Sequence, residues 1–230
     1  MKKIGIIGAM DLEVQTLKEQ LHNASVTVRA NMEFYEGRLG AADVVVVRCG
    51  IGKVNAALCI QILADLFGVT HVINTGIAGS LNAKLDIGDI LISEIAIHHD
   101  MDVRIFGYAA GQVPGLPSRE FAADAAMTDT AEAVCRELGL KAIRGRVVSG
   151  DQFICDSAVK DRLITEFQGD CCEMEGASIA HGAFLNDIPF LILRAISDKA
   201  DGSAEMDYPT FEKAAAEHCA ALTEALVQRL

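Results

Sequence analysis

The feature that most constrains the fold is an apolar run near the carboxyl end of the chain, Phe190-Leu-Ile-Leu-Arg-Ala-Ile-Ser-Asp198, which follows Pro189. Strands that are apolar on both faces are typical of parallel sheets covered by helices on both sides. The run ends in Arg194, Ser197 and Asp198, polar groups whose burial without partners is costly. Asp198 therefore either caps the next segment, pairs with Arg194 or serves a ligand site, since open α/β sheets bind ligands at the carboxyl ends of their strands.

Segments typical of strands and of helices alternate along the chain. Apolar or alternating runs predict strands at 3–7, 25–30, 32–39, 43–49, 71–76, 88–98, 142–149, 170–175 and 189–197. Helical spacing of apolar residues predicts helices at 11–21, 55–67, 122–138, 157–167, 177–186 and 209–230. This order predicts a single α/β domain over residues 1–230, a three-layer α/β/α sandwich with a mixed, largely parallel, twisted central sheet. The segment at 25–49 predicts an antiparallel portion, and the Gly- and Pro-containing segment at 100–120 predicts a long loop.

Charge narrows the partners that such a domain could bind. The chain carries 20 Lys and Arg against 32 Asp and Glu, a net charge of −12. Nucleic acids and anionic membranes are held mainly by Lys and Arg, so we expect neither as a partner. The start Met-Lys-Lys is followed by no signal-peptide cleavage site, and no apolar run reaches membrane-spanning length, which predicts a cytoplasmic protein.

The seven cysteines favour buried thiols over a disulfide framework or a zinc site. Their number is odd and none forms a Cys-x-x-Cys pair, as expected in a reducing compartment. The adjacent Cys171 and Cys172 could be redox-active, but two small core residues are the more ordinary explanation.

Three glycine-containing turns follow predicted strands. Gly5-Ile-Ile-Gly8 lacks the spacing of a dinucleotide fingerprint, and Gly50-Ile-Gly52-Lys53 lacks that of a phosphate-binding loop. The third, Asn74-Thr-Gly-Ile-Ala-Gly79-Ser80, would let the backbone approach a ligand closely, although tight turns alone would also explain its glycines. Glu13 follows the first turn, where an acid either serves a site or simply favours the helix dipole.

Two further acids flank a methionine in Glu173-Met-Glu175, between a short strand and a helix. On a strand, Glu173 and Glu175 would face one way and Met174 the other. Sugar hydroxyls could supply the donors that buried carboxylates need. Alternatively, one acid caps the following helix and the other pairs with Arg194.

Six segments in a fixed order carry a family resemblance. They are Met10–Glu13, Gly50-Ile-Gly-Lys53, Asn74-Thr-Gly through Gly79, Ser149-Gly-Asp-Gln-Phe153-Ile154, Glu173-Met-Glu175 and Arg194-Ala-Ile-Ser-Asp198. Over essentially its whole length the chain resembles the 5′-methylthioadenosine/S-adenosylhomocysteine nucleosidases of the nucleoside phosphorylase/hydrolase superfamily. The resemblance implies hydrolysis of the N-glycosidic bond of these nucleosides, and of 5′-deoxyadenosine, to release adenine, as in methionine salvage. It implies no cofactor and no metal.

The resemblance also implies roles for two catalytic carboxyl groups. Asp198 would be the general acid that protonates N7 of adenine, with Ser197 orienting it, because adenine leaves more easily as a neutral molecule. Glu13 would be the base that activates the attacking water, with Arg194 nearby. Asp198 must then hold a proton near neutral pH, which requires burial or a suitable hydrogen bond.

Other matched positions would bind the substrate. Glu175 would accept hydrogen bonds from the ribose hydroxyls, Met174 would pack on the sugar, and Phe153 would stack on adenine. The backbone of Ile154 would read the adenine edge, and Tyr208 would close over the base and ribose where the family more often has Phe. The remaining implied substrate-binding positions are Met10, Ile51, Ile77, Gly79, Glu173, Arg194 and Ser197.

The long loop acquires a role in the same way. Val103, Phe106 and Pro114 match family positions that cross a homodimer interface and line the partner subunit's 5′-thio pocket. One departure concerns Ile77, because the family often has Ser there and Ile cannot donate a hydrogen bond.

Three other functions remain open at this stage. A phosphorolytic purine nucleoside phosphorylase would need Arg or Lys near the sugar, whereas this chain has Glu13 at the water-activating position. A related hydrolase could act on another adenine nucleoside such as aminodeoxyfutalosine. A nucleoside sensor without activity would not need the acid and the base.

Overall fold

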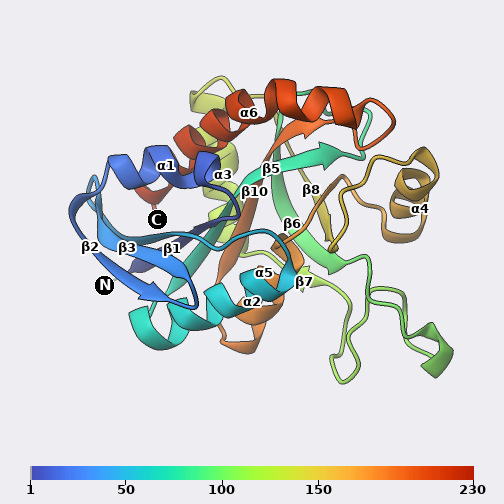
Figure 1. Cartoon of the computed structure of the whole chain (residues 1–230), viewed down its shortest axis with the longest axis horizontal. Helices are drawn as coiled ribbons and strands as arrows, with labels where there is room; N and C mark the ends of the chain where they lie inside the picture. Colours follow the sequence, from blue (N-terminus) through green and yellow to red (C-terminus); the bar gives the residue numbers. More distant parts are fainter. Residues whose placement is uncertain (1) are drawn as a thin grey trace.

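The computed structural model describes residues 2–230, the side chains of residues 205 and 206 excepted, and shows a twisted sheet between layers of helices (Figure 1). The ten strands are β1 (Lys3–Gly8), β2 (His22–Arg29), β3 (Met32–Leu39), β4 (Ala42–Arg48), β5 (His71–Ser80), β6 (Ile90–His98), β7 (Phe121–Ala122), β8 (Ala142–Ser149), β9 (Cys171–Glu173) and β10 (Phe190–Asp198). The helical elements are α1 (Asp11–Glu19), α2 (Lys53–Ile62), the π-helical η1 (Leu63–Phe67), the 3-10 turn η2 (Arg104–Phe106), α3 (Ala125–Glu137), α4 (Ser157–Phe167), α5 (Gly176–Leu185) and α6 (Ala204–Val227).

The sheet is mixed, as predicted. Parallel pairings join β4 to β1, β1 to β5 and β5 to β10 in its centre. β2, β3 and β4 form the predicted antiparallel portion at one edge. Beyond β10 the sheet continues through β6, β8 and β9 and returns to β5, so this half closes on itself.

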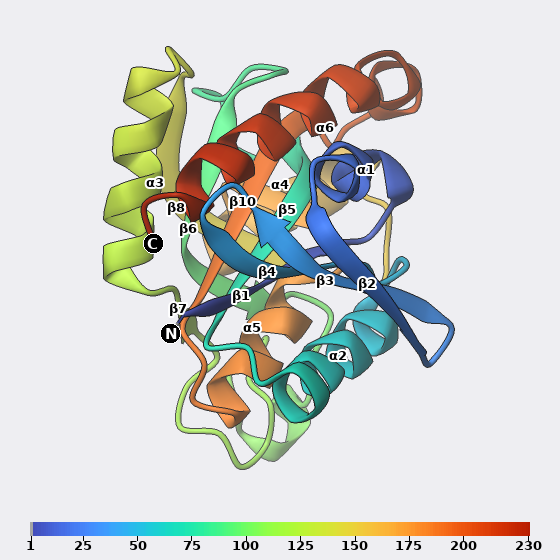
Figure 2. The same ribbon diagram turned by 90° about the vertical axis from the view of Figure 1, so that its left-hand side faces the viewer.

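Helices cover both faces of the sheet, which confirms the expected layers (Figure 2). On one face, apolar side chains of α1, α3 and α6 pack on alternate strand residues such as Ile4, Ile6 and Ile73. On the other face, α2 and α5 pack on Ile7 and Val72 among others. Alternation along each strand divides the core in this way, because successive side chains point to opposite faces.

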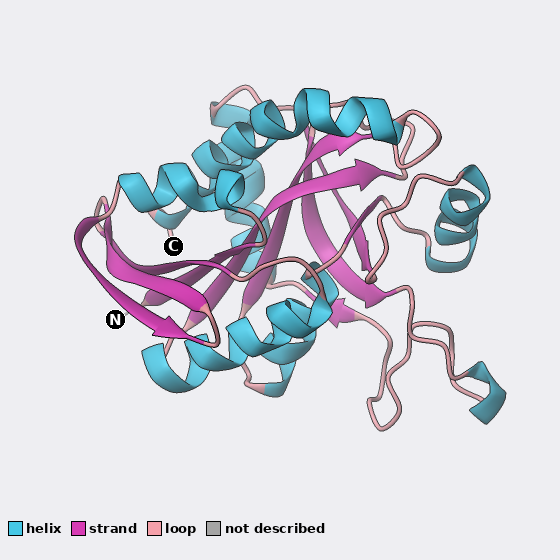
Figure 3. Ribbon diagram, in the orientation of Figure 1, coloured by secondary structure: helices cyan, strands magenta, loops and turns pink. Residues whose placement is uncertain are grey.

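The largest differences from the predicted elements lie beside the site. β5 continues to Ser80, four residues past the predicted end at 76, since its glycines remain extended and paired. α6 begins at Ala204, with Pro209 inside it, whereas the helix was predicted only from about residue 209. The two-residue β7 was not predicted. Figure 3 shows the loop between β6 and β7 extending away from the sheet, with η2 at its tip.

Within residues 2–230, no helix is both long enough and apolar enough to cross a bilayer.

Candidate active site

A cavity of about 380 Å³ opens at the carboxyl ends of β1, β5 and β10. This is the edge at which the sequence predicted a ligand site. The cavity is lined by Ala9, Met10, Glu13, Ile51, Ile77, Ala78, Gly79, Gln152, Phe153, Ile154, Cys172, Glu173, Met174, Glu175, Ser197, Asp198 and Tyr208. It thus brings together every predicted catalytic and substrate-binding residue except Arg194, which lies behind its wall.

Glu13 enters the cavity from the first turn of α1, directly after β1. Its carboxyl group accepts hydrogen bonds from the backbone N–H groups of Ala9 (2.6 Å), Met10 (2.9 Å) and Ile77 (3.1 Å). The residue is only 4% exposed, and this burial raises the pKa of the carboxyl group, although the charge of Arg194 and the three donors oppose the rise. The result is a fixed carboxyl group that binds a proton more readily than a surface glutamate.

Gly76 explains how Glu13 and Arg194 come close to the same part of β5. A Cβ atom at this position would lie 2.4 Å from Oε1 of Glu13 and 2.7 Å from Nη1 of Arg194. Only a residue without a side chain leaves room for both groups. The predicted proximity of Arg194 to Glu13 is therefore present in the structure, although no hydrogen bond joins them among the contacts described.

Asp198 ends β10 after a register shift that displaces Ser197 from the pairing with β5. Its carboxyl group accepts hydrogen bonds from the Ser197 hydroxyl (2.9 Å) and from the Ala200 N–H (2.8 Å). Burial raises the pKa of Asp198, the two hydrogen bonds lower it, and the nearby charges of Asp207 and Asp201 raise it again, with a net rise. Asp198 is thus a buried acid whose proton is held more tightly than usual.

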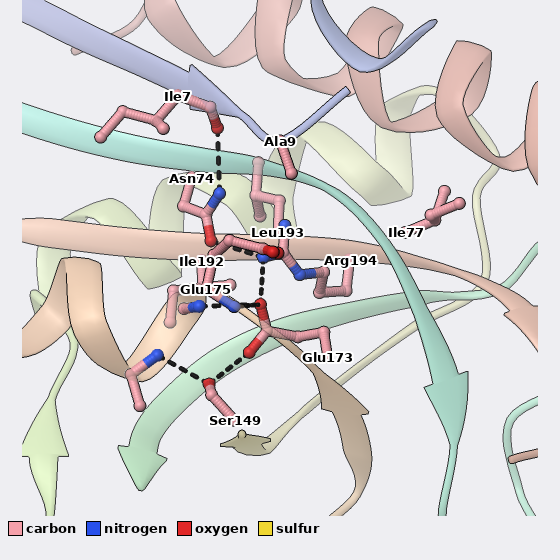
Figure 4. A network of polar contacts seen from close by, with 12 residues as sticks. Ile7, Ala9, Asn74, Ile77, Ser149, Glu173, Glu175, Ile192, Leu193 and Arg194 are labelled. Atoms are coloured by element: carbon pink, nitrogen blue, oxygen red, sulfur yellow. Dashed lines mark hydrogen bonds and ion pairs between the residues drawn. The ribbon is translucent and has the colours of Figure 1, made fainter. Parts of the chain in front are cut away.

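Arg194 is fully buried and forms an ion pair with Glu173 rather than with Asp198 (Figure 4). Its guanidinium also donates to Oδ1 of Asn74 (2.6 Å), and the Asn74 amide donates to the Ile7 carbonyl (2.9 Å). The Ser149 hydroxyl donates to the other oxygen of Glu173. The contacts from Ile7 to Ser149 thus join five strands around the cavity, namely β1, β5, β10, β9 and β8.

Glu173 both pairs with Arg194 and caps the following helix, roles that the sequence had divided between Glu173 and Glu175. Besides pairing with Arg194, it accepts from the N–H groups of Glu175 (3.0 Å) and Gly176 (2.7 Å) at the start of α5. Burial alone would raise the pKa of Glu173, but the Arg194 charge and the hydrogen bonds outweigh burial and lower it. The carboxylate therefore stays ionised beside its cation.

The pKa of Glu175 is shifted in the opposite direction to that of Glu173. It lies at the N-terminus of α5 and accepts a hydrogen bond from the Gly52 N–H (2.8 Å). Burial and the neighbouring charge of Glu173 raise the pKa of Glu175 to about 8. Because β9 ends at Glu173, the predicted strand alternation stops there, and Met174 lines the cavity together with both acids.

Apolar and aromatic side chains form the rest of the wall. The rings of Phe153 and Tyr208 meet edge to face at 5.5 Å, and the Tyr208 hydroxyl donates to the sulfur of Met10 (3.4 Å). Phe153 is half exposed, which leaves one of its sides free for a planar ligand. Ile77 is nearly buried, so this part of the wall is apolar.

Three predicted residues lie away from the cavity of the single chain. Val103, Phe106 and Pro114 belong to the extended loop, and the Phe106 side chain is 75% exposed. Four further residues line the cavity although no sequence motif predicted a role for them: Ala9, Ala78, Gln152 and Cys172. Cys172 was expected in the core, and it is indeed buried, but its position beside Glu173 on β9 also places it at the wall.

In the part of the chain that the structure describes, no group of three or more His, Cys, Asp or Glu side chains is arranged to hold a metal ion.

Comparison with known proteins assigns the chain first to a broad class. The family model described as the phosphorylase superfamily matches residues 3–228. A fold of this kind with a cavity at the strand ends agrees with that class.

Close relatives then narrow the assignment. The chain is 41% identical over 230 residues to the 5′-methylthioadenosine/S-adenosylhomocysteine nucleosidase of Shewanella sediminis, covering 99% of this chain and 100% of the relative. The crystal structure of the corresponding Neisseria meningitidis nucleosidase with methylthio-immucillin-A matches with a TM-score of 0.97 and 38% identity, covering 100% of both chains. A futalosine hydrolase from Helicobacter pylori matches with a TM-score of 0.95 and 31% identity, covering 100% of this chain and 98% of its own. The chain belongs to the 5′-methylthioadenosine/S-adenosylhomocysteine nucleosidase family, which confirms the resemblance found in its motifs.

Proposed function

We propose that this protein hydrolyses the N-glycosidic bond of 5′-methylthioadenosine and S-adenosylhomocysteine, and also of 5′-deoxyadenosine. The observation that carries the proposal is that two buried carboxyl groups with raised pKa, Asp198 and Glu13, face one cavity from different elements. Such a pair can supply an acid for the leaving group and a base for water.

Asp198 acts as the general acid. It gives its proton to N7 of adenine while the C1′–N9 bond breaks and the bonding electrons move into the purine. The base then leaves as neutral adenine, and the ribosyl group passes through an oxocarbenium-like transition state. The Ser197 hydroxyl and the Ala200 N–H stabilise the aspartate that remains.

Glu13 acts as the base that takes a proton from water as its oxygen bonds to C1′. Its carboxyl group lies against Gly76 of β5 and that of Asp198 lies against Gly79, three residues further along. The two carboxyl groups therefore meet β5 at different points, as separate roles for a base and an acid require.

The other cavity residues bind the substrate. Glu175 accepts from the ribose hydroxyls, Met174 packs on the sugar, and Phe153 stacks on adenine beside Tyr208. The backbone of Ile154 selects the 6-amino purine. A protonated Glu175, favoured by its raised pKa, can also donate one hydrogen bond.

The 5′ end of the site is completed in a homodimer. Val103, Phe106 and Pro114 of each subunit line the partner's pocket for the apolar thio substituent. The exposed Phe106 on a loop that leaves the sheet supports this assignment. Residues 1–230 act as a single domain, since the apolar clusters on both faces share one sheet, and the seven free cysteines support a cytoplasmic location.

The test is adenine release from 5′-methylthioadenosine in a phosphate-free buffer containing a chelator. We expect full activity, with adenine and 5-methylthioribose as products. Adenine that forms only when phosphate is added would instead identify a phosphorylase. Against that alternative, no Lys or Arg is found among the cavity-lining residues in the described chain.

The likeness to a futalosine hydrolase supports one second candidate, hydrolysis of another adenine nucleoside such as aminodeoxyfutalosine. A panel of adenine nucleosides that differ only at the 5′ position would rank these substrates by kcat/KM. Binding of every panel member without release of adenine would identify a sensor.

A further inference from the structure

The turn after Asp198 is held by a lysine from another part of the fold. Lys160 of α4 donates from Nζ to the backbone carbonyl of Lys199 (2.5 Å) and to Oδ2 of Asp201 (3.0 Å). Its side chain is only 20% exposed. The ammonium group of Lys160 therefore contacts both chain neighbours of Ala200, namely Lys199 and Asp201.

A second lysine holds the same turn from the opposite direction. Lys199 donates from Nζ to the Leu85 carbonyl (2.7 Å) and to Oδ1 of Asp86 (2.9 Å). These acceptors lie in the connection between β5 and β6. Lys160 and Lys199, which we call the lysine clamp, therefore fasten the turn to two separate parts of the molecule.

The clamped residue, Ala200, has an unfavourable backbone conformation. Its φ is +51°, in the left-handed region, and the residue is fully buried. Such a conformation is unfavourable by about 1–2 kcal/mol for a residue other than glycine, so the surroundings must impose it. In this conformation the Ala200 N–H points back and donates to Oδ1 of Asp198 (2.8 Å).

Little space remains in which Asp198 could shift. A Cβ atom at Gly79 would lie 2.8 Å from Oδ1 of Asp198 and 2.9 Å from Cβ of Ala200. The Asp198 carboxyl group, the Ala200 methyl group and the β5 backbone are thus in close contact. Any relaxation of the turn around Ala200 would move the carboxyl group or remove one of its two donors.

We propose that Lys160 and Lys199 are positioning residues that set the carboxyl group of Asp198 for protonation of the leaving base. This inference rests on the proposed function, and it adds two residues that do not line the cavity. The clamp fixes the Ala200 N–H, which directs the Asp198 proton in the resting enzyme and stabilises the aspartate after proton transfer. Lys160 and Lys199 act through Asp198 and have no contact with the substrate.

A merely structural role predicts a different result. The Lys160–Asp201 and Lys199–Asp86 ion pairs are partly exposed, and such pairs contribute about 0–1 kcal/mol to stability. Their loss would then lower the melting temperature slightly and would affect all substrates alike. A positioning role affects only the step that needs the acid.

The experiment compares two leaving groups in the full-length enzyme. One substrate is 5′-methylthioadenosine. The other carries 4-nitrophenolate in place of adenine, a group that leaves as a stable anion without protonation. For Lys160→Met we expect kcat on the adenine substrate to fall roughly 10- to 100-fold, with KM changed less than about threefold. On the nitrophenyl substrate we expect less than about a threefold change.

Three further variants complete the test. Lys199→Met should show the same dependence on the leaving group, with a smaller loss of kcat on the adenine substrate. This variant replaces Lys160→Met in the test if Lys160→Met does not fold. Lys160→Arg, which can still donate to both acceptors, should recover most of the activity. Lys3→Met is the control, since it removes an equal charge from a partly exposed pair with Glu36, away from the turn after Asp198, and should leave both substrates unaffected.

Two outcomes would overturn the proposal: unchanged kcat on 5′-methylthioadenosine, or equal losses on the two substrates. Both differ from failure of the proposed function, in which the unmodified enzyme itself would release no adenine.

Discussion

Replacing Glu175 by Gln should stabilise the protein at alkaline pH while it impairs substrate binding. Burial and the charge of Glu173 raise the pKa of Glu175 from 4.5 to about 8. A carboxyl group whose pKa is higher in the folded state contributes stability that is complete below about pH 4.5 and is lost as the pH rises towards 8. Gln keeps an acceptor for the Gly52 N–H but cannot ionise, so the variant should not lose this stability.

The expected change in the free energy of unfolding follows from the same two pKa values. The interval from 4.5 to about 8 corresponds to at most about 5 kcal/mol, at about 1.4 kcal/mol for each pH unit. Relaxation of the surroundings and entry of water reduce such penalties, so we expect Glu175→Gln to stabilise by about 1–3 kcal/mol at pH 8.5. For a chain of 230 residues this raises the melting temperature by roughly 2–12 °C.

The assay is thermal unfolding of both proteins at pH 5 and pH 8.5, at equal protein concentration. The difference in melting temperature should be small at pH 5 and large at pH 8.5. The surface variant Glu94→Gln is the control and should change the melting temperature by less than about 2 °C at either pH. A Glu175→Gln protein that is less stable than the parent at pH 8.5, or one with the same difference at both pH values, would refute the reasoning.

Three other perturbations test separate parts of the site. Asp198→Asn should lower kcat by about 10²- to 10⁴-fold with little change in KM. Near-normal turnover of this variant would show that Asp198 is not the general acid. Gly76→Ala should abolish activity, because the new Cβ would lie 2.4 Å from Oε1 of Glu13, and unaltered kcat/KM would contradict that crowding. Arg194→Met should destabilise the fold by about 3–5 kcal/mol in urea unfolding, since it leaves buried Glu173 without its cation; a loss below about 1 kcal/mol would show that this ion pair is unimportant.

Many elements of the fold could be predicted from local pattern. The strands at 32–39 and 142–149 and the helix at 157–167 have the predicted limits, because their periodicity and their turn or capping residues agree. The predicted ends of strands and helices are wrong where tertiary contacts determine them. β5 continues through Gly76 and Gly79 because β10 and β9 pair with it there, and no local signal in a glycine-rich segment shows such pairing.

The predicted site residues lie together at one cavity. The motifs did not predict which of these residues form ion pairs or hydrogen bonds with one another. The choice of Glu173 rather than Asp198 as the partner of Arg194 depends on which strand ends come together. Cys172 and Gln152 line the cavity because of where β9 and the segment after β8 lie, and neither residue type suggests a site by itself.

The sequence by itself determined the alternating α/β pattern, the buried strand that ends at Asp198 and the order of the motifs that identify the family. These depend on side-chain periodicity and on residues close together in the chain. Only the tertiary structure decided the surroundings of each buried carboxyl group: Glu173 ionised beside Arg194, and Glu175 and Asp198 with their pKa values raised by burial. The physical reason is that a pKa depends on burial and on charges and hydrogen bonds within a few ångströms, and for Glu173 and Glu175 those neighbours come from segments as distant as residues 13, 52, 149 and 194.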